Sequence, residues 1–216
     1  MSKVTQKLEL DQPISETQKR MSNVPTRMAG FDLNHRQRYA TPEEIEWLRT
    51  TTGHISSEGL AIMLGAGPGV MTAAIKDGNP TIHVFMVDND TCHYAIAHLR
   101  DYGPDYAQNV YAMVGDSAAV GTRYDGRQAD LLVIDADHSE KGVRDDIICW
   151  LSHVKPGGYI MIHDYDASGT WFENQEQYPG VKLAADSLLK RYKVLGRVGT
   201  SMVYINELEE VDERLY

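Results

Sequence analysis

Short apolar runs alternate along this chain with longer segments in which apolar residues recur every three or four positions. The apolar runs predict buried strands over 60–65, 81–88, 109–114, 130–135 and 157–163. The segments with helical spacing predict helices over 41–51, 69–77, 91–102, 139–153 and 181–192. Strands and helices that alternate in this way predict a parallel sheet with helices on both faces.

The helix expected over 139–153 has a clear core-facing side. That side carries Val143, Ile147, Trp150, Leu151 and Val154, a stripe typical of a helix packed against a sheet. On this spacing Asp146 is expected to face solvent, together with its neighbours Arg144 and Asp145. The sequence Lys155-Pro156-Gly157-Gly158 then predicts the end of the helix and a turn into the next strand.

The C-terminal part of the chain has a different pattern. Two strand-like runs, Tyr192–Val198 and Ser201–Ile205, are joined by Gly199-Thr200 and predict a hairpin. One strand of this hairpin must then be antiparallel to the other strands of the sheet. The sequence therefore predicts an α/β fold, a doubly wound Rossmann-like sheet of seven strands, mostly parallel with one antiparallel strand near the C-terminus.

Length and composition favour one large domain with a substantial core. The chain has 216 residues, of which 42% are hydrophobic. Residues 1–40 are polar and weakly periodic. They predict either an extension that covers the active site or a partner subunit of a homo-oligomer, or a disordered segment. The domain itself is expected over 41–216.

Charge and cysteine content narrow the expected partners and location. The net charge of −10 disfavours a nucleic acid or an anionic membrane, because their phosphates demand a basic surface. No apolar run reaches about 18 residues, so no membrane span is expected. Cys92 and Cys149 fall in predicted helices without metal spacing, which is typical of reduced core thiols in a cytoplasmic protein.

The strongest motif is the turn after the first predicted strand. An apolar run over 61–64 leads into Gly65-Ala66-Gly67-Pro68-Gly69, and a helix is expected to follow. Such a turn places bare backbone N–H groups against a ligand, because glycine lets the backbone approach closely. The spacing is G-x-G-x-G, whereas the dinucleotide fingerprint is G-x-G-x-x-G. The turn therefore predicts a nucleotide-like cofactor and argues against NAD.

The next predicted strand ends in Asp88, 23 residues after Gly65. An acid about 20 residues beyond such a turn is placed to accept hydrogen bonds from the two ribose hydroxyls. The alternative is that Asp88 caps the following helix, a role that Asn89, Asp90 or Thr91 can also fill. Because the turn and the acid occur together, ribose binding is the favoured interpretation.

Acidic groups also follow the other predicted strands. These groups are Gly115-Asp116-Ser117, Asp135-Ala136-Asp137-His138 and His163-Asp164-Tyr165-Asp166. Ligands of such sheets bind beyond the carboxyl ends of the strands. So many carboxylates at one edge repel each other unless a divalent cation, a cationic substrate or a sulfonium cofactor is present.

Three of these residues are candidates for chemistry. Asp135 and Asp164 end neighbouring predicted strands, so they can share one divalent cation, or each can cap the turn that follows it. His138 is a candidate general base because an imidazole titrates near neutral pH. His163 is interpreted first as a hydrogen-bonded histidine at a strand end, with a ligand or base role as the alternative.

These motifs, in this order and at this spacing, resemble the class I S-adenosylmethionine-dependent methyltransferases over about residues 40–206. Within them, the D-x-D-H-S…H-D-Y pattern is similar to the small-molecule O-methyltransferases that include macrolide-sugar and aminocoumarin-sugar enzymes, and to catechol O-methyltransferase. The resemblance implies S-adenosylmethionine as cofactor, Mg²⁺ in the metal-dependent members, and a small hydroxylated methyl acceptor.

The resemblance also implies which residues bind and which react. The implied cofactor contacts are Gly65, Ala66, Gly67, Gly69, Asp88, Asn89, Asp116, Ser117 and Asp135. Asp135 and Asp164 match positions that carry magnesium, so Asp135 counts as catalytic as well. His138 falls where catechol-type enzymes place a catalytic lysine, which implies an altered base. Met63 departs from the pattern, which usually has glutamate at this position.

Two other classes of function stay open at this point. An NAD-dependent oxidoreductase would use the same kind of turn, although the glycine spacing argues against it. A non-catalytic domain would bind the cofactor as a sensor or scaffold, and Met63 together with the histidine in place of the lysine leaves this open. The density of carboxylates argues for chemistry.

Overall fold

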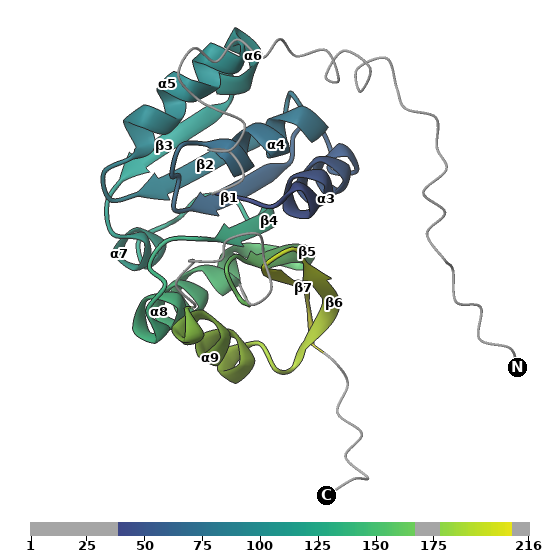
Figure 1. The fold of residues 1–216 in the computed structure, drawn as a ribbon, viewed down its shortest axis with the longest axis vertical. Coiled ribbons are helices and arrows are strands. Elements are labelled where there is room, and N and C mark those ends of the chain that lie inside the picture. The colour runs from purple at the N-terminus through teal and green to yellow at the C-terminus, as the bar shows by residue number, and fades with distance from the viewer. Residues whose placement is uncertain (1–38, 167–177, 209–216) are drawn as a thin grey trace, which may run out of the picture.

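The structure is a computed structural model that describes residues 39–166 and 178–208, and these form one sheet covered by helices on both faces (Figure 1). The strands are β1 Leu60–Leu64, β2 His83–Asp88, β3 Val110–Val114, β4 Ala129–Ile134, β5 Val154–Ile162, β6 Tyr192–Val198 and β7 Ser201–Leu208. The helices are α3 Pro42–Gly53, α4 Val70–Gly78, α5 Cys92–Tyr102, α6 Pro104–Ala107, α7 Ser117–Gly121, α8 Glu140–Trp150 and α9 Pro179–Leu188, with a 3-10 turn at Leu151–His153.

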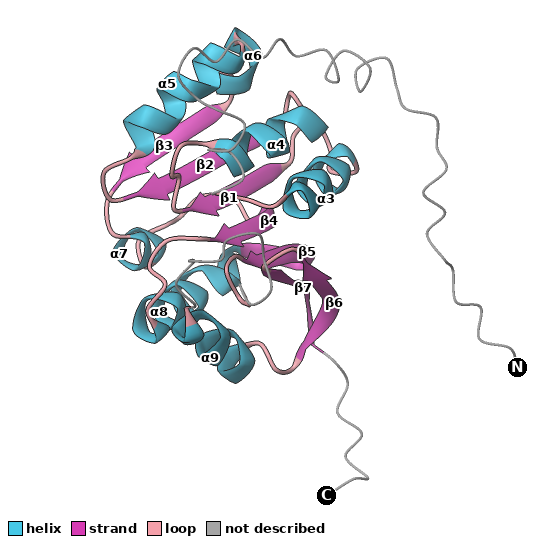
Figure 2. Ribbon diagram, viewed as in Figure 1, coloured by secondary structure: helices cyan, strands magenta, loops and turns pink. Residues whose placement is uncertain are grey.

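The seven strands lie in the order β3-β2-β1-β4-β5-β7-β6 (Figure 2). The pairs β1–β2, β1–β4, β2–β3 and β4–β5 are parallel, and only β7 runs against its neighbours β5 and β6. The predicted Rossmann-like sheet with one antiparallel strand is therefore confirmed. The chain reverses its direction of travel across the sheet between β1 and β4, and ligands of such sheets bind at this point.

A buried apolar layer lies on each face of the sheet, because successive strand residues point to opposite faces. In β1, Ala61 and Met63 face the layer that also holds residues of α3, α4 and α5. Ile62 and Leu64 face the layer that holds residues of α8 and α9. All five residues of β1 are buried, as expected for a central strand of a sheet covered on both sides.

Some boundaries differ from the predicted ones. α9 ends at Leu188 and β6 already begins at Tyr192, so the helix predicted to reach residue 192 is shorter. The predicted turn at 155–158 lies within β5, at the place where its pairing with β4 changes register. α6 and α7 have only 4 and 5 residues, too few for a periodic pattern to reveal them.

The predicted N-terminal extension lies almost wholly outside the described residues, which begin at Tyr39. Within 39–166 and 178–208, none of the helices combines the length and the apolar character that crossing a membrane requires.

Candidate active site

A cavity of about 780 Å³ opens at the carboxyl ends of the parallel strands. Most of the predicted site residues line it, namely Gly65, Gly67, Asp88, Asn89, Asp116, Ser117, Asp135, His138 and Asp164. Ala66 and Gly69 belong to the same glycine turn but do not line the cavity. The structure thus brings together residues from five strand ends that are far apart in the sequence.

The glycine turn has the backbone geometry that its sequence predicts. Gly65, Gly67 and Gly69 have φ values of 82°, 47° and 83°, which residues with a side chain rarely adopt. Gly65 donates its N–H to the carbonyl of Val87 at 2.8 Å. A Cβ atom on Gly65 would lie 1.9 Å from the carbonyl oxygen of Asp135, whereas one on Gly67 would meet nothing within 4 Å. Of these two glycines, only Gly65 is therefore fixed by close backbone contact.

Gly65→Ala is expected to lower the free energy of unfolding far more than Gly67→Ala. Both variants carry the cost of a positive φ, about 1–2 kcal/mol, but only the alanine at position 65 collides with the backbone of the neighbouring strand end. We expect Gly65→Ala to cost at least about 3 kcal/mol in total. Urea unfolding of the two variants measures the difference, and equal losses would contradict this account of the turn.

Asp88 supports the glycine turn as well as facing the cavity. Its Oδ2 accepts hydrogen bonds from the backbone N–H of Ala66 at 2.8 Å and of Gly67 at 3.4 Å. Its Oδ1 accepts from the N–H of Asp90 at 3.0 Å and of Thr91 at 2.8 Å. Partial burial opposes ionisation, but the hydrogen bonds from Thr91, Asp90 and Ala66 outweigh it and lower the pKa of Asp88. Asp88 is therefore not the cap of α5, whose N-cap is Thr91, but its carboxylate supports the turn before that helix and faces the cavity.

Asp116 and Ser117 lie at the start of α7. Asp116 is the N-cap, and its Oδ1 accepts from the N–H of Ala119 at 2.8 Å. Ser117 Oγ donates to Oδ1 of Asp146 at 2.5 Å. Asp146 is only 1% exposed, so its predicted solvent-facing position is wrong. It points inward because α7 packs against α8 and covers the side of α8 that carries Asp146.

The burial of Asp146 predicts a pH-dependent effect on stability. Burial raises the pKa of Asp146 to about 6, and the hydrogen bond from Ser117 only partly offsets this. A raised carboxyl pKa destabilises the folded protein once the pH exceeds the unfolded pKa, and the penalty is complete above the folded pKa. We expect Asp146→Asn to stabilise the protein by on the order of 2–3 kcal/mol at pH 7.5 and hardly at all at pH 4.

Urea unfolding at the two pH values tests this prediction. Asp145→Asn is the matched control, because Asp145 is exposed and pairs with Lys141 at the surface. An Asp146→Asn variant with the same stability gain at pH 4 and pH 7.5 would contradict the proposed cause.

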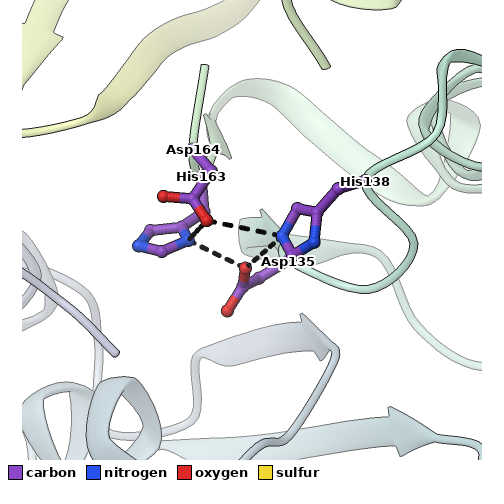
Figure 3. A group of neighbouring side chains, drawn as sticks. All are labelled: Asp135, His138, His163 and Asp164. Atoms are coloured by element: carbon purple, nitrogen blue, oxygen red, sulfur yellow. Dashed lines mark hydrogen bonds and ion pairs between the residues drawn. The ribbon is translucent and has the colours of Figure 1, made fainter. Parts of the chain in front are cut away.

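Two carboxylates and two imidazoles meet at the other side of the cavity (Figure 3). Asp135 and His138 follow β4, and His163 and Asp164 follow β5. Asp135 Oδ1 lies 2.8 Å from His163 Nδ1 and 3.3 Å from His138 Nε2. Asp164 Oδ2 lies 3.5 Å from His138 Nε2 and 3.6 Å from His163 Nδ1. The predicted pair Asp135 and Asp164 therefore shares one site with both histidines.

The charges of this cluster explain how its carboxylates and imidazoles are held together. Burial would keep His163 neutral, but Asp135 and Glu44 outweigh it and raise the pKa of His163 well above its ordinary value. Asp135 has a lowered pKa despite its burial, chiefly because His163 faces it. Burial raises the pKa of Asp164. The His163 imidazolium thus serves as the cation that this group of carboxylates requires, and His138 remains the candidate base.

Glu44 is the residue of this site that the sequence analysis missed. It is completely buried, and its Oε2 lies 3.5 Å from His163 Nε2. Burial alone would raise its pKa, but His163 and the hydrogen bond from Thr200 lower it to about 2. The sequence indicates only a helix start, and the capping box of Thr41 and Glu44 confirms this. The long-range contact to His163 leaves no local signal.

His138 also has a ring partner. Its imidazole stacks on the ring of Tyr178, with 4.3 Å between the centroids and 18° between the planes. Tyr178 stands just before α9 and lines the same cavity. Stacking restricts the imidazole to one orientation, which keeps its Nε2 directed at the two carboxylates.

Comparison with known proteins agrees with this geometry. Residues 63–165 match the family model described as a methyltransferase domain. No curated protein matches the chain with significance.

Solved structures with this fold are similar over most of the chain. The SAH-bound Podospora anserina methyltransferase PaMTH1 is 16% identical, with a TM-score of 0.63 over 94% of this chain and 99% of that chain. The O-methyltransferase TomG from Streptomyces achromogenes, in complex with SAM, is 14% identical, with a TM-score of 0.60 over 79% and 81%. An O-methyltransferase from Bacillus cereus, in complex with SAH, is 16% identical, with a TM-score of 0.56 over 91% and 93%.

At such identities these structures establish the fold. The methyltransferase-domain model matched over residues 63–165, slightly less than half of the chain, agrees with the class I methyltransferase that the sequence motifs predicted.

Proposed function

We propose that this methyltransferase transfers the methyl group of S-adenosylmethionine to a hydroxyl group of a small metabolite. The observation that carries the proposal is the division of one cavity into two parts. The glycine turn and Asp88 form the cofactor side, and the cluster of Asp135, His138 and Asp164 forms the reacting side. The SAM and SAH complexes of the structural neighbours support this choice of cofactor.

The cofactor would lie along the strand ends from α7 to the glycine turn. Gly65, Ala66, Gly67 and Gly69 would surround the methionine part, Asp88 with Asn89 would bind the ribose hydroxyls, and Asp116 and Ser117 would flank the adenine. Asp135, at the end of β4, would stand between the cofactor and the acceptor. This order follows the order of the strands whose ends carry these residues, from β3 through β2 and β1 to β4.

The transfer itself is an in-line displacement. The acceptor oxygen attacks the methyl carbon, the carbon–sulfur bond breaks, and S-adenosylhomocysteine leaves with the electron pair of that bond. Holding both reactants in line within one cavity is a large part of such catalysis. In our proposal His138 takes the hydroxyl proton on Nε2, and Asp135, at 3.3 Å, stabilises the imidazolium that forms.

The residues present also fit a divalent cation. Ligand atoms of Asp135, His138, His163 and Asp164 all lie within 4.8 Å of one another, so Asp135 and Asp164 would hold the ion as the resemblance implies. A bound cation would lower the pKa of the acceptor hydroxyl and orient its oxygen. Assistance by a divalent cation is thus part of the proposal, and His138 would act in the same way with or without it.

The dehydrogenase alternative is weaker. The chain contains the spacing Tyr-x-x-x-Lys at Tyr178 and Lys182, a pair found in one group of NAD-dependent oxidoreductases. In the structure, however, Lys182 Nζ donates to the hydroxyl of Tyr165 at 2.7 Å, while the ring of Tyr178 stacks on His138. The lysine is therefore engaged away from the reacting side of the cavity.

Calorimetric titration of the purified chain tests the proposal. S-adenosylmethionine and NAD are titrated separately, each with magnesium and with EDTA. We expect binding of S-adenosylmethionine and none of NAD. Methyl transfer is then measured with labelled cofactor and a panel of sugars and phenols. Failure to bind S-adenosylmethionine under every condition would refute the proposed function, and binding without transfer to any acceptor would favour the non-catalytic alternative.

A further inference from the structure

We propose that the strand-end cluster is built for a first-row transition ion rather than for Mg²⁺, with His163 as a nitrogen ligand and Glu44 as the carboxylate that orients it. The inference deepens the proposed function and rests on it, because it concerns the same reacting side of the cavity. It is carried by the contacts of His163 and Glu44, which the proposed transfer does not use.

Three ligand atoms converge from the ends of β4 and β5. Nδ1 of His163 lies 2.8 Å from Asp135 Oδ1 and 3.6 Å from Asp164 Oδ2. An ion at about 2.0–2.2 Å from each donor requires donor separations of roughly 3–4 Å. The two separations that involve Nδ1 are therefore close to this range, and the ligand atoms of the cluster all lie within 4.8 Å of one another. His138 Nε2, at 3.3–3.5 Å from both carboxylates, borders the remaining positions and stays available as the base.

The donor set determines which ion is preferred. Mg²⁺ takes oxygen ligands in a near-ideal octahedron and keeps several waters. Imidazole nitrogen favours Mn²⁺, Fe²⁺, Co²⁺ and Zn²⁺ over Mg²⁺, and affinity rises along that series of metals for mixed nitrogen and oxygen sites. One imidazole and two carboxylates on one side of an ion, with open positions opposite, make a site of this mixed kind. His163 is thus the residue that decides the selectivity.

Glu44 gives His163 the arrangement of a metal-binding histidine. Such a histidine directs its second ring nitrogen at a carboxylate, which fixes the ring and leaves the first nitrogen for the ion. Here Nε2 of His163 is buried and makes no hydrogen bond among the described residues, and Glu44 Oε2 faces it as an ion-pair partner at 3.5 Å. Nδ1 is thereby left on the side of Asp135 and Asp164.

Glu44 is itself held firmly. Its Oε1 accepts from Thr200 N–H at 3.0 Å, Thr200 Oγ1 at 2.7 Å and Ser201 Oγ at 2.7 Å. Its Oε2 accepts from Thr41 N–H at 2.6 Å. A completely buried carboxylate with this many fixed donors cannot rotate away from His163. The ring orientation is therefore set before any ion arrives.

The test is metal binding by the full chain after treatment with EDTA. Mg²⁺, Mn²⁺, Co²⁺ and Zn²⁺ are titrated separately by calorimetry, and Co²⁺ is also followed by its visible absorption, which responds to a nitrogen ligand. We expect Co²⁺ and Zn²⁺ to bind at least about 100-fold more tightly than Mg²⁺. Equal or tighter binding of Mg²⁺ would overturn the inference.

Variants of the two residues separate their roles. His163→Glu supplies oxygen in place of nitrogen, so the preference for Co²⁺ over Mg²⁺ should fall by at least about 10-fold. Glu44→Gln should weaken Co²⁺ binding by about 10–100-fold. His54→Gln, an exposed histidine outside the cavity, is the matched control and should change nothing. An unchanged preference in His163→Glu would exclude nitrogen ligation.

Binding of S-adenosylmethionine is measured on the same samples. It shows that each variant is folded, and it separates the two proposals. Cofactor binding without affinity for any of the four ions would overturn the inference and leave the proposed function standing, and the His163 imidazolium would then take the place of the ion. Metal binding as expected without cofactor binding would refute the proposed function alone.

Discussion

Replacing Asp88 with alanine is expected to weaken the binding of S-adenosylmethionine by at least about 100-fold. The variant loses the carboxylate proposed to accept hydrogen bonds from the ribose, and a charged hydrogen bond contributes about 1.5–3 kcal/mol. It also releases the N–H groups of Ala66 and Gly67, which Asp88 Oδ2 holds at 2.8 Å and 3.4 Å. Calorimetric titration measures the loss.

Two further variants show whether the charge of Asp88 or its support of the glycine turn contributes more to cofactor affinity. Asp90→Ala changes an exposed neighbour and should bind the cofactor as the unchanged protein does. Asp88→Asn keeps an acceptor for the turn but removes the negative charge. Its affinity for S-adenosylmethionine should therefore lie between those of Asp88→Ala and Asp90→Ala. Full affinity in Asp88→Ala would mean that the cofactor does not reach this edge of the cavity.

Replacing His138 with alanine is expected to lower kcat by about 100–10,000-fold, the usual contribution of a general base. The affinity for S-adenosylmethionine should change little, because His138 lies on the reacting side of the cavity, beside Asp135 and Asp164. Labelled methyl transfer gives kcat, and calorimetry gives the affinity. A matched control is His93→Ala, which removes an exposed histidine of α5.

A second variant distinguishes the base from its support. Tyr178→Leu removes the ring that stacks on His138 but leaves the imidazole, so kcat should fall less than in His138→Ala. A kcat that stays within a few-fold of the original in His138→Ala would contradict the assignment of the base and would direct attention to Asp135.

Much of the fold could be predicted because its signals are local. The buried run of β1, the glycine turn and the acid that ends β2 lie within short windows of sequence, so their places in the fold could be predicted without any long-range contact. The two-strand hairpin at the end was also predictable, since a glycine turn joins its strands. The short helices α6 and α7 could not be predicted, because one turn of helix shows no period.

The candidate site was predictable only in part, for a physical reason. Asp135 and Asp164 could be paired because the carboxyl ends of neighbouring parallel strands share an edge. Glu44 could not be assigned to the site from the sequence, because its contact to Thr200 spans 156 residues. This contact depends on how α3 packs against the hairpin of β6 and β7. Asp146 was placed on the wrong side because the helical pattern does not show that α7 covers that face of α8.

The contacts of Glu44 also have a consequence for how the protein becomes active during its synthesis. The carboxylate comes from α3, at the beginning of the described chain, and three of its donor groups belong to Thr200 and Ser201, near the end. A growing chain already contains every residue of the cavity wall before the hairpin has left the ribosome. Until Thr200 and Ser201 dock, however, Glu44 has only the local hydrogen bond from Thr41 to hold it against His163. The reacting half of the cavity therefore matures last, after the cofactor half, and a nascent chain would acquire a place for the cofactor before it acquires an ordered catalytic cluster.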